Sequence, residues 1–397
     1  MATQRNFKLV VMLALIAGLG PISIHVILPV LPSIETAFGA SDAVTQLTLT
    51  LGVVTMAIST IGYGPAADRF GRKPVILFGL VMFVAGSALC VWSANIEVLI
   101  FGRVVQAIGG AAGLVISRAI IRDMFSREQS ARVIGQVMSI VIIAPIVAPV
   151  VGGFLAEFAG WRYVFVLAVA MGAISLVVAV PGVRETHTPD TGSNILRQML
   201  RAFPELLRTP AFLAYAGYAG CGMGMFMVIA GGMPFVMVEV FDASPSAFGL
   251  WFMLMTGSFL LGTVLSSRFT ERIGLDRMIR WGSAGAALSA IAIPALLLAG
   301  FITPWAIFAP GFFMGTCHGL AMPNAQAGAV SVNPRIAGSA SGLVMFLQMT
   351  IGAGFGQIAG MLPHASPVPV AILVGCAGIG GFLLYSGAML FHRQPNE

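Results

Sequence analysis

Charge is scarce in this sequence. Only 9% of its 397 residues are Asp, Glu, Lys or Arg, whereas 58% are hydrophobic and the mean hydropathy is +0.94. A soluble domain carries about 25% charged residues, so this chain has too little polar surface to cover a particle in water. The composition excludes a cytosolic enzyme, a secreted domain and a disordered chain, and it indicates a protein that folds in a lipid bilayer.

Cysteine is rarer still, and its positions argue against a metal site. The four cysteines, Cys90, Cys221, Cys317 and Cys376, fall inside apolar segments and lack metal-binding spacing. We therefore expect free thiols that pack as small hydrophobic side chains, with no bound metal and no cofactor. The sequence also contains no P-loop, so we expect that ATP hydrolysis does not drive this protein.

Long apolar runs dominate the chain instead. A helix needs about 20 apolar residues to cross the hydrocarbon core of a membrane. The N-terminal segment starts basic and turns apolar like a signal peptide, but it lacks a small-residue cleavage site, so we expect a retained first helix. The sequence predicts an all-α membrane protein with twelve transmembrane helices. These lie near residues 8–29, 43–66, 74–95, 98–121, 133–156, 162–183, 211–238, 247–267, 278–300, 305–328, 338–362 and 367–391.

The basic residues orient the predicted helices. All but three of the 21 flank loops on one side, and the exceptions are Arg103, Arg118 and Arg162. Basic loops mark the cytoplasmic side of a membrane protein, and an even number of spans places both termini there. We expect a monomer in the bacterial inner membrane. Because the basic residues are scattered between apolar runs, we expect no nucleic-acid partner.

The two halves of the chain repeat. At an offset of 203 residues, ADRFGRKPVI (67–76) aligns with TERIGLDRMI (270–279). The sequence predicts an N-terminal six-helix bundle over 1–183, a cytoplasmic linker with a surface helix over 184–210, and a C-terminal six-helix bundle over 211–397. Duplicated six-helix halves are a transporter architecture, with the substrate site where the halves meet.

The loop between the second and third spans carries a motif. It reads GPAADRFGRKP, from Gly64 to Pro74. Gly71 permits a tight turn, and the basic residues hold the loop at the anionic inner surface. A simple topology anchor would explain these basic residues but not Asp68.

The motif resembles the signature loop of the major facilitator superfamily. The resemblance implies two pseudo-symmetric six-helix bundles and a cluster that latches the halves together in one conformation. At the end of the fourth span, an Arg-Asp pair resembles one that the family places beside this loop. The predicted latch consists of Asp68, Arg69, Gly71, Arg72, Arg122 and Asp123.

The fourth span carries an unusual polar stripe. Its segment RVVQAIGG (103–110) resembles the R-x-x-Q-G element of the same family. At about 100° per residue, Arg103, Gln106 and Arg118 share one helix face. Buried cations without acids are costly and normally face a bundle interior or water, so we predict that Arg103 lies in the transport pathway. Purely structural hydrogen bonding is the alternative for Arg103, and snorkelling to the cytoplasmic surface is the alternative for Arg118.

Proline and glycine interrupt the fifth span. In APIVAPVVGG (144–153), Pro145 and Pro149 remove backbone donors and bend the helix, while Gly152 and Gly153 permit close packing. This segment resembles the fifth-helix motif of the superfamily's exporters, although an ordinary kinked helix is the alternative. Together with PVLP (29–32) and AGSASGL (337–343), it makes the chain most similar to the Bcr/CflA group of drug-resistance efflux proteins.

The first span departs from that group's pattern. Where the group usually reads D-x-Y-L-P, this chain reads HVILP from His25 to Pro29, and every acid lies in a loop or near a helix end. A proton antiporter needs a titratable group that proton and substrate share, so His25 is the leading candidate and His318 the second. A neutral histidine bonded to a backbone carbonyl is the alternative. The predicted residues for substrate and proton coupling are His25, Arg103, Gln106, Arg118, His318 and Gln348.

The sequence therefore predicts a secondary transporter that exports amphipathic drugs or other small molecules, driven by protons through alternating access. Uptake or facilitated passage of a small neutral or anionic solute is the alternative, and the absence of acids in the membrane core favours it over export of cations. An intramembrane enzyme would need converging catalytic groups or metal ligands, and we expect no catalytic residue here. The duplicated halves argue against a channel.

Overall fold

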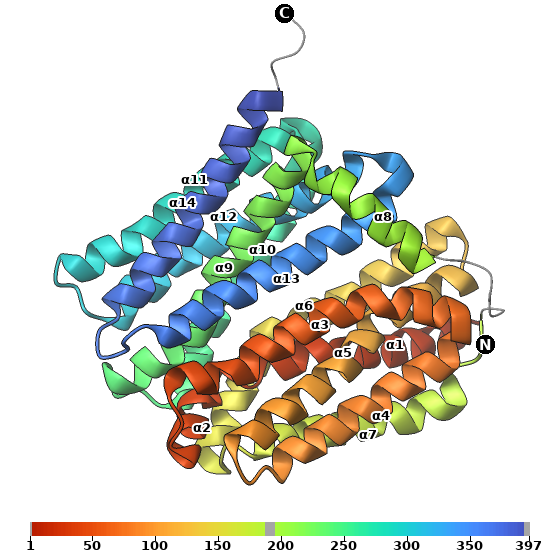
Figure 1. The fold of residues 1–397 in the computed structure, drawn as a ribbon, viewed down its shortest axis with the longest axis horizontal. Coiled ribbons are helices and arrows are strands. Elements are labelled where there is room, and N and C mark those ends of the chain that lie inside the picture. Colours follow the sequence, from red (N-terminus) through yellow and green to blue (C-terminus); the bar gives the residue numbers. More distant parts are fainter. Residues whose placement is uncertain (1, 187–194, 393–397) are drawn as a thin grey trace, which may run out of the picture. The chain divides into compact units, whose positions relative to one another are not determined.

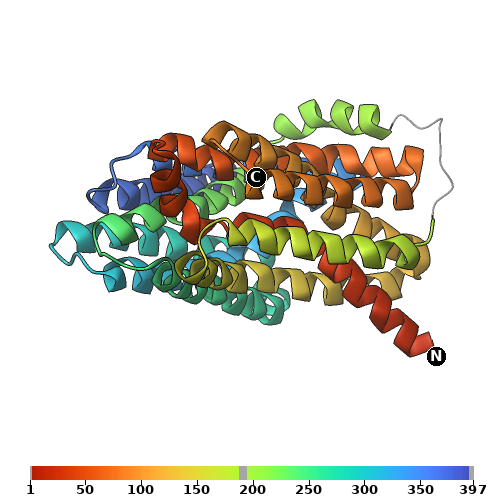
Figure 2. The ribbon, with the colours of Figure 1, turned by 90° about the horizontal axis from the view of Figure 1, so that it is seen from below.

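The structure, a computed structural model, describes residues 2–186 and 195–392 (Figure 1). The chain divides into two compact units, Met1–Leu196 and Arg197–Glu397. The boundary between them falls within the segment that we take as the linker, of which residues 187–194 lie outside the described part. Within each unit the long helices run side by side, as Figures 1 and 2 show from two directions.

Six long helices build the described part of the first unit. They are α1 (Ala2–His25), α3 (Asp42–Phe70), α4 (Arg72–Val91), α5 (Ile96–Met124), α6 (Arg127–Phe158) and α7 (Tyr163–Gly182). The last five confirm the predicted spans of this half with ends that differ by a few residues. Helix α5 packs against α1, α3 and α4, and α1 also packs against α6 and α7.

The first span is not the continuous helix that the sequence predicts over 8–29. Helix α1 ends at His25, a turn follows at residues 26–27, and the chain continues through a 3₁₀ turn, η1 (Leu28–Val30), into a short helix, α2 (Leu31–Phe38). Pro29 and Pro32 lack backbone N–H groups, so an α-helix from residue 25 would lose two of its hydrogen bonds. The break and α2 are corrections to the sequence-based interpretation.

Among its described residues, the second unit also contains six long helices. They are α9 (Pro210–Glu239), α10 (Pro245–Ile273), α11 (Leu275–Leu298), α12 (Pro304–Ser331), α13 (Ala337–Met361) and α14 (Val368–His392). A 3₁₀ turn, η2 (Pro334–Ile336), precedes α13, and α9 packs against α12, α13 and α14. The predicted linker helix is present as α8 (Ile195–Leu207), whose Leu206 joins the buried apolar cluster of this unit.

Eleven spans in the described part of the chain are long and apolar enough to cross a membrane. Helix α12 lies at the place of the predicted tenth span and is 28 residues long, but it is not among these eleven. We attribute its lower hydropathy to the polar side chains of His318, Asn324 and Gln326. It contacts α9, α10, α11 and α13, so these polar groups lie on a helix with neighbours on several sides.

The internal repeat is visible in the backbone. Gly71 (φ 93°, ψ 156°) separates α3 from α4, and Gly274 (φ 90°, ψ 145°) separates α10 from α11, at the offset of 203 residues. The positive φ of both turns favours glycine. Ser41 and Ser244 cap α3 and α10 by accepting from the amides of Val44 and Ala247. The same offset thus relates both the caps and the turns of the two halves.

Candidate functional site

Arg103 joins four helices of the first unit. Its side chain is buried in α5, and the residue is only 2% exposed. Its Nε donates to the carbonyl oxygen of Thr48 in α3 (3.1 Å), and its Nη1 donates to the carbonyl oxygen of Ser23 in α1 (3.0 Å) and to the side-chain oxygen of Gln106. Gln106 in turn donates to the hydroxyl oxygen of Ser87 in α4 (2.7 Å).

Backbone dipoles, rather than an acid, stabilise this buried cation. Ser23 lies in the last turn of α1, where carbonyl groups lack intrahelical donors and cations are favoured. On the side of α3, a Cβ at Gly52 would lie 3.4 Å from Nη2 of Arg103, so the glycine leaves room for the guanidinium. The structure brings Arg103 and Gln106 together as predicted, in a hydrogen-bonding arrangement that also fits the structural alternative.

The other predicted coupling residues make contacts of their own. In the first unit, His25 is buried at the end of α1 and its Nδ1 lies 2.7 Å from the carbonyl oxygen of Pro21. Arg118 is half-buried, and its Nη2 lies 3.0 Å from the sulfur of Met138 in α6. The contact of His25 with a carbonyl of its own helix is the arrangement expected of a neutral histidine.

The remaining two predicted coupling residues, His318 and Gln348, lie in the second unit. Nδ1 of His318 in α12 lies 3.2 Å from the hydroxyl of Tyr218 in α9, and the two rings are 5.7 Å apart. The side-chain oxygen of Gln348 in α13 accepts from the amide of Gln326 in α12 (3.0 Å). The first contact ties α12 to α9, and the second ties α12 to α13.

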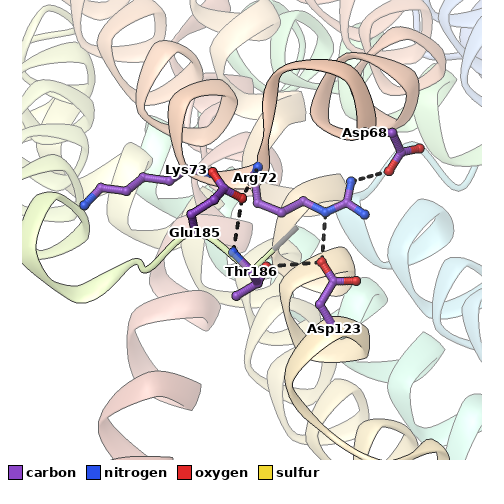
Figure 3. A network of polar contacts seen from close by, with 6 residues as sticks. All are labelled: Asp68, Arg72, Lys73, Asp123, Glu185 and Thr186. Carbon is purple, nitrogen blue, oxygen red and sulfur yellow. Dashed lines mark hydrogen bonds and ion pairs between the residues drawn. The ribbon is translucent and has the colours of Figure 1, made fainter. Parts of the chain in front are cut away.

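An ion-pair network lies at the turn between α3 and α4 (Figure 3). Arg72 Nη1 lies 2.5 Å from Oδ1 of Asp68, and Arg72 Nε lies 3.0 Å from Oδ2 of Asp123. The side chain of Arg72 is 8% exposed and those of the acids about 20%. Because the three residues belong to α3, α4 and α5, one arginine links three helix ends at this side of the unit.

The remaining predicted latch residues have different surroundings. The guanidinium of Arg69 lies 5.4 Å from the ring centre of Phe70, its neighbour in sequence. Arg122 is exposed and belongs to neither ion pair of Arg72. Gly71 forms the turn with positive φ. The structure therefore brings together three of the six residues and gives a fourth a role in the backbone.

The sequence does not predict two residues of this network. Both carboxylate oxygens of Glu185 accept from the backbone of α4, and the hydroxyl of Thr186 donates to Oδ2 of Asp123 (3.1 Å). The sequence indicates these two residues only indirectly. Helix α4 begins after Gly71 and has no side-chain cap of its own, so its free amides need an acceptor from elsewhere in the chain.

The Pro/Gly segment lies within one helix. Helix α6 runs through Pro145 and Pro149, and Gly152 packs against the backbone of Val26, in the turn after α1. An apolar cavity of about 380 Å³ lies between α1, α6 and α7, beside this segment. Ala144, Val147, Ala148 and Val151 line it from α6. Its lining is suited to aliphatic or aromatic groups and offers no charge.

A further polar cluster in the second unit was not predicted. The carboxylate of Asp276, in the first turn of α11, accepts from the hydroxyls of Tyr215 in α9 (3.2 Å) and Tyr385 in α14 (3.1 Å). Between α10 and α12, Asn324 donates to the hydroxyl oxygen of Ser266 (2.8 Å). These bonds join neighbouring helices without burying a cation.

Long apolar helices in two compact units, repeated about the same turns and caps, define a membrane transport protein. The family model of the Major Facilitator Superfamily matches residues 13–357, and the chain belongs to this superfamily. It is therefore a transporter of small molecules in a membrane, and not an enzyme.

Several relatives match nearly the whole chain. The bicyclomycin resistance protein homolog of Haemophilus influenzae is 27% identical over 96% of this chain and 96% of its own length. Multidrug resistance protein D of Escherichia coli is 27% identical over 96% and 95%. The chloramphenicol resistance protein of Pseudomonas aeruginosa is 29% identical over 90% and 84%. These relatives confirm the resemblance to the Bcr/CflA group.

Solved structures share the fold. A bacterial homolog of the human lysosomal transporter Spinster has a TM-score of 0.77 at 20% identity and covers 99% of both chains. The xylose transporter XylE from E. coli has a TM-score of 0.75 at 14% identity, covering 99% of this chain and 97% of its own. At these identities the likeness confirms the twelve-helix, two-bundle transporter fold.

Proposed function

We propose that this transporter exports small, uncharged or amphipathic compounds, drugs among them, in exchange for protons. The proposal is carried by the relatives, whose names are those of drug-resistance proteins and which align with 90% or more of this chain. An exporter with alternating access would expose the substrate site to each side of the membrane in turn. The protein would act as a monomer in the bacterial inner membrane, with both termini in the cytoplasm.

The distribution of charge supports uncharged substrates. Arg103 and Arg118 are cationic residues of the fourth span, and every acid of the sequence lies in a loop or near a helix end. A lipophilic cation in the membrane core would find no carboxylate partner and would meet like charge. The apolar cavity beside α6 likewise has only neutral lining residues.

Proton coupling is assigned to His25, with His318 as the second candidate. The first span lacks the acid of its relatives' pattern, and histidine is the side chain whose ordinary ionisation falls in the physiological range. Binding of a proton at His25 would add charge to a buried site, which an uncharged substrate would not stabilise. Proton and substrate would then compete for the same state.

Uptake of a small neutral or anionic solute is the second candidate, because two cations and no acid lie in the membrane core. Everted membrane vesicles that contain the protein distinguish the two directions. An exporter accumulates radiolabelled chloramphenicol inside such vesicles during respiration, and a protonophore releases it. Respiration-driven depletion of the solute from the vesicles, in place of accumulation, would contradict export.

A further inference from the structure

Helix α4 takes its cap from a distant part of the chain. The first amides of a helix have no intrahelical acceptor, and Gly71, which precedes α4, has no side chain to supply one. The carboxylate of Glu185 fills this role: Oε1 accepts from the amide of Arg72 (2.8 Å) and Oε2 from that of Lys73 (3.1 Å). Glu185 follows α7, so the start of the linker is bound to the start of α4 (Figure 3).

Gly71 also leaves room for the carboxylate of Glu185. A Cβ at this position would lie 2.6 Å from Oε2 of Glu185. The glycine therefore permits the turn and leaves the space in which the carboxylate reaches the helix. A negative charge at this place is favourable as well, because a helix N-terminus carries partial positive charge.

Thr186 closes a ring of contacts. Its amide donates to Oε1 of Glu185 (3.1 Å), and its hydroxyl donates to Oδ2 of Asp123 (3.1 Å). The same Asp123 oxygen accepts from Nε of Arg72 (3.0 Å). The backbone of Arg72 is thus held by Glu185, its side chain by Asp123, and the two acceptors are joined through Thr186. Lys73 adds a contact from Nζ to the carbonyl oxygen of Val180 in α7 (2.9 Å).

We propose that Glu185 and Thr186 are positioning residues of the latch. They hold Arg72 where its guanidinium reaches both Asp68 and Asp123, so the ion pairs form only while the start of the linker is bound to α4. The chain continues from Thr186 through the linker into the second unit. A transport step that pulls on the linker would therefore loosen the ion pairs, and breaking the ion pairs would release the linker.

The second unit shows that this device is specific to the first. At the offset of 203 residues, Gly274 makes the same turn as Gly71, but the acid beside it, Asp276, belongs to the first turn of α11 itself. Asp276 is held by tyrosines of α9 and α14 and not by a segment that leaves the unit. Among the described residues, only in the first unit is the glycine turn between two helices bonded to the linker.

Amide hydrogen exchange of the purified full-length protein tests the proposal without a substrate. In Glu185→Ala the amides of Arg72 and Lys73 should exchange about tenfold faster or more, because each loses a hydrogen bond to a charged acceptor. Glu205→Gln is the matched control: this acid of α8 accepts from the side chain of Asn333 (2.8 Å) and does not touch the latch. Unchanged exchange at Arg72 and Lys73 in Glu185→Ala would overturn the proposal.

A second variant distinguishes a ring of contacts that acts as one unit from a carboxylate that only caps α4. Asp68 contacts Arg72 and does not belong to the contacts of Thr186 given above. If the ring acts as one unit, Asp68→Asn should speed exchange of the Thr186 amide about threefold or more, because coupling is reciprocal. If Glu185 is only a cap for α4, the Thr186 amide should exchange as in the unaltered protein, and the proposal fails.

A third experiment measures transport, and it rests on the proposed function. In proteoliposomes with chloramphenicol as the probe, Glu185→Gln and Asp123→Asn should each lower the transport rate, and the double variant should be no slower than the slower single one. Independent, multiplying losses would contradict a shared role. If the unaltered protein does not transport chloramphenicol, the proposed substrate class fails, while the exchange results still decide whether the linker belongs to the latch.

Discussion

At the scale of single residues, the main finding is how a buried arginine is stabilised in a membrane protein without an acid. Arg103 is bound by the carbonyl oxygens of Thr48 and Ser23 and by the side chain of Gln106. The planar guanidinium presents donors in several fixed directions, which a lysine ammonium on a flexible stem does not. The arginine therefore fixes three helices as well as carrying charge.

We expect Arg103→Lys to destabilise the protein. The lysine ammonium is a single point and would not reach all three acceptors, at about 1 kcal/mol or more for each lost bond, so the unfolding temperature in detergent should fall clearly. Arg118→Lys is the control, because Arg118 bonds to the weak acceptor Met138. Equal unfolding temperatures for the two variants would show that the carbonyl contacts do not support the fold.

A second prediction concerns His25. If proton and substrate compete at this residue, the affinity for chloramphenicol should weaken as the pH falls through the range where histidine becomes protonated. His25→Gln should bind chloramphenicol with an affinity independent of pH, as measured by equilibrium binding. His318→Gln is the matched control and should keep the pH dependence of the unaltered protein.

A pH dependence that survives in His25→Gln and disappears in His318→Gln would move the coupling site to α12. A dependence that survives in both would contradict proton coupling at either histidine. In that case His25 would have a structural role, and the contact of its Nδ1 with the Pro21 carbonyl would be part of that role.

At the scale of elements, close packing of α4 and α5 places the Arg103 network. A Cβ at Gly109 would overlap the backbone of Phe83, and one at Gly86 would overlap the backbone of Gln106. Small residues at such contacts let membrane helices approach each other. Because Gln106 bonds to Ser87 across this contact, the spacing of the two helices sets the geometry of the network.

Gly109→Ala should therefore lower the unfolding temperature, because the added methyl group forces α4 and α5 apart. Gly135 offers a matched control in α6, since a Cβ there meets nothing within 4 Å. Gly135→Ala should leave the unfolding temperature unchanged or raise it, because alanine favours a helix by about 1 kcal/mol over glycine. Equal effects of the two substitutions would contradict the packing argument.

The elements also show what the sequence predicts and what it does not. Apolar length predicts the long helices, and the repeat predicts the paired turns at Gly71 and Gly274. Each of these features depends on residues that are neighbours in the sequence. The break after His25 was missed, since hydropathy does not record that Pro29 and Pro32 lack hydrogen-bond donors. The contact of Glu185 with α4 was missed because it joins residues more than 110 positions apart.

For the predicted coupling residues, too, the sequence predicts some of the contacts and not others. One helical stripe correctly paired Arg103 with Gln106, because residues three apart lie on one face. Arg103 also donates to backbone carbonyls of α1 and α3, and no side-chain pattern reveals these partners. For His318, the bond to Tyr218 depends on how α9 and α12 pack, and a single sequence does not specify that packing.

At the scale of the whole molecule, the proposed orientation follows from the charges. Cysteines introduced at Ser41, between α2 and α3, and at Arg208, between α8 and α9, should react with a membrane-impermeant maleimide from opposite sides of the membrane. The basic loops define the cytoplasmic side, so Arg208→Cys should react in everted vesicles and Ser41→Cys in intact cells. Reaction of both from one side would contradict the orientation.

The central claim is that a proton gradient drives the movement of an uncharged compound through this protein. The most direct measurement uses the purified protein in proteoliposomes with an imposed pH gradient and two probes, chloramphenicol and the lipophilic cation tetraphenylphosphonium. We predict that chloramphenicol moves against its own concentration gradient until an ionophore removes the pH gradient, and that the cation does not. Movement of chloramphenicol that stops at equal concentrations, or driven transport of the cation, would contradict the account.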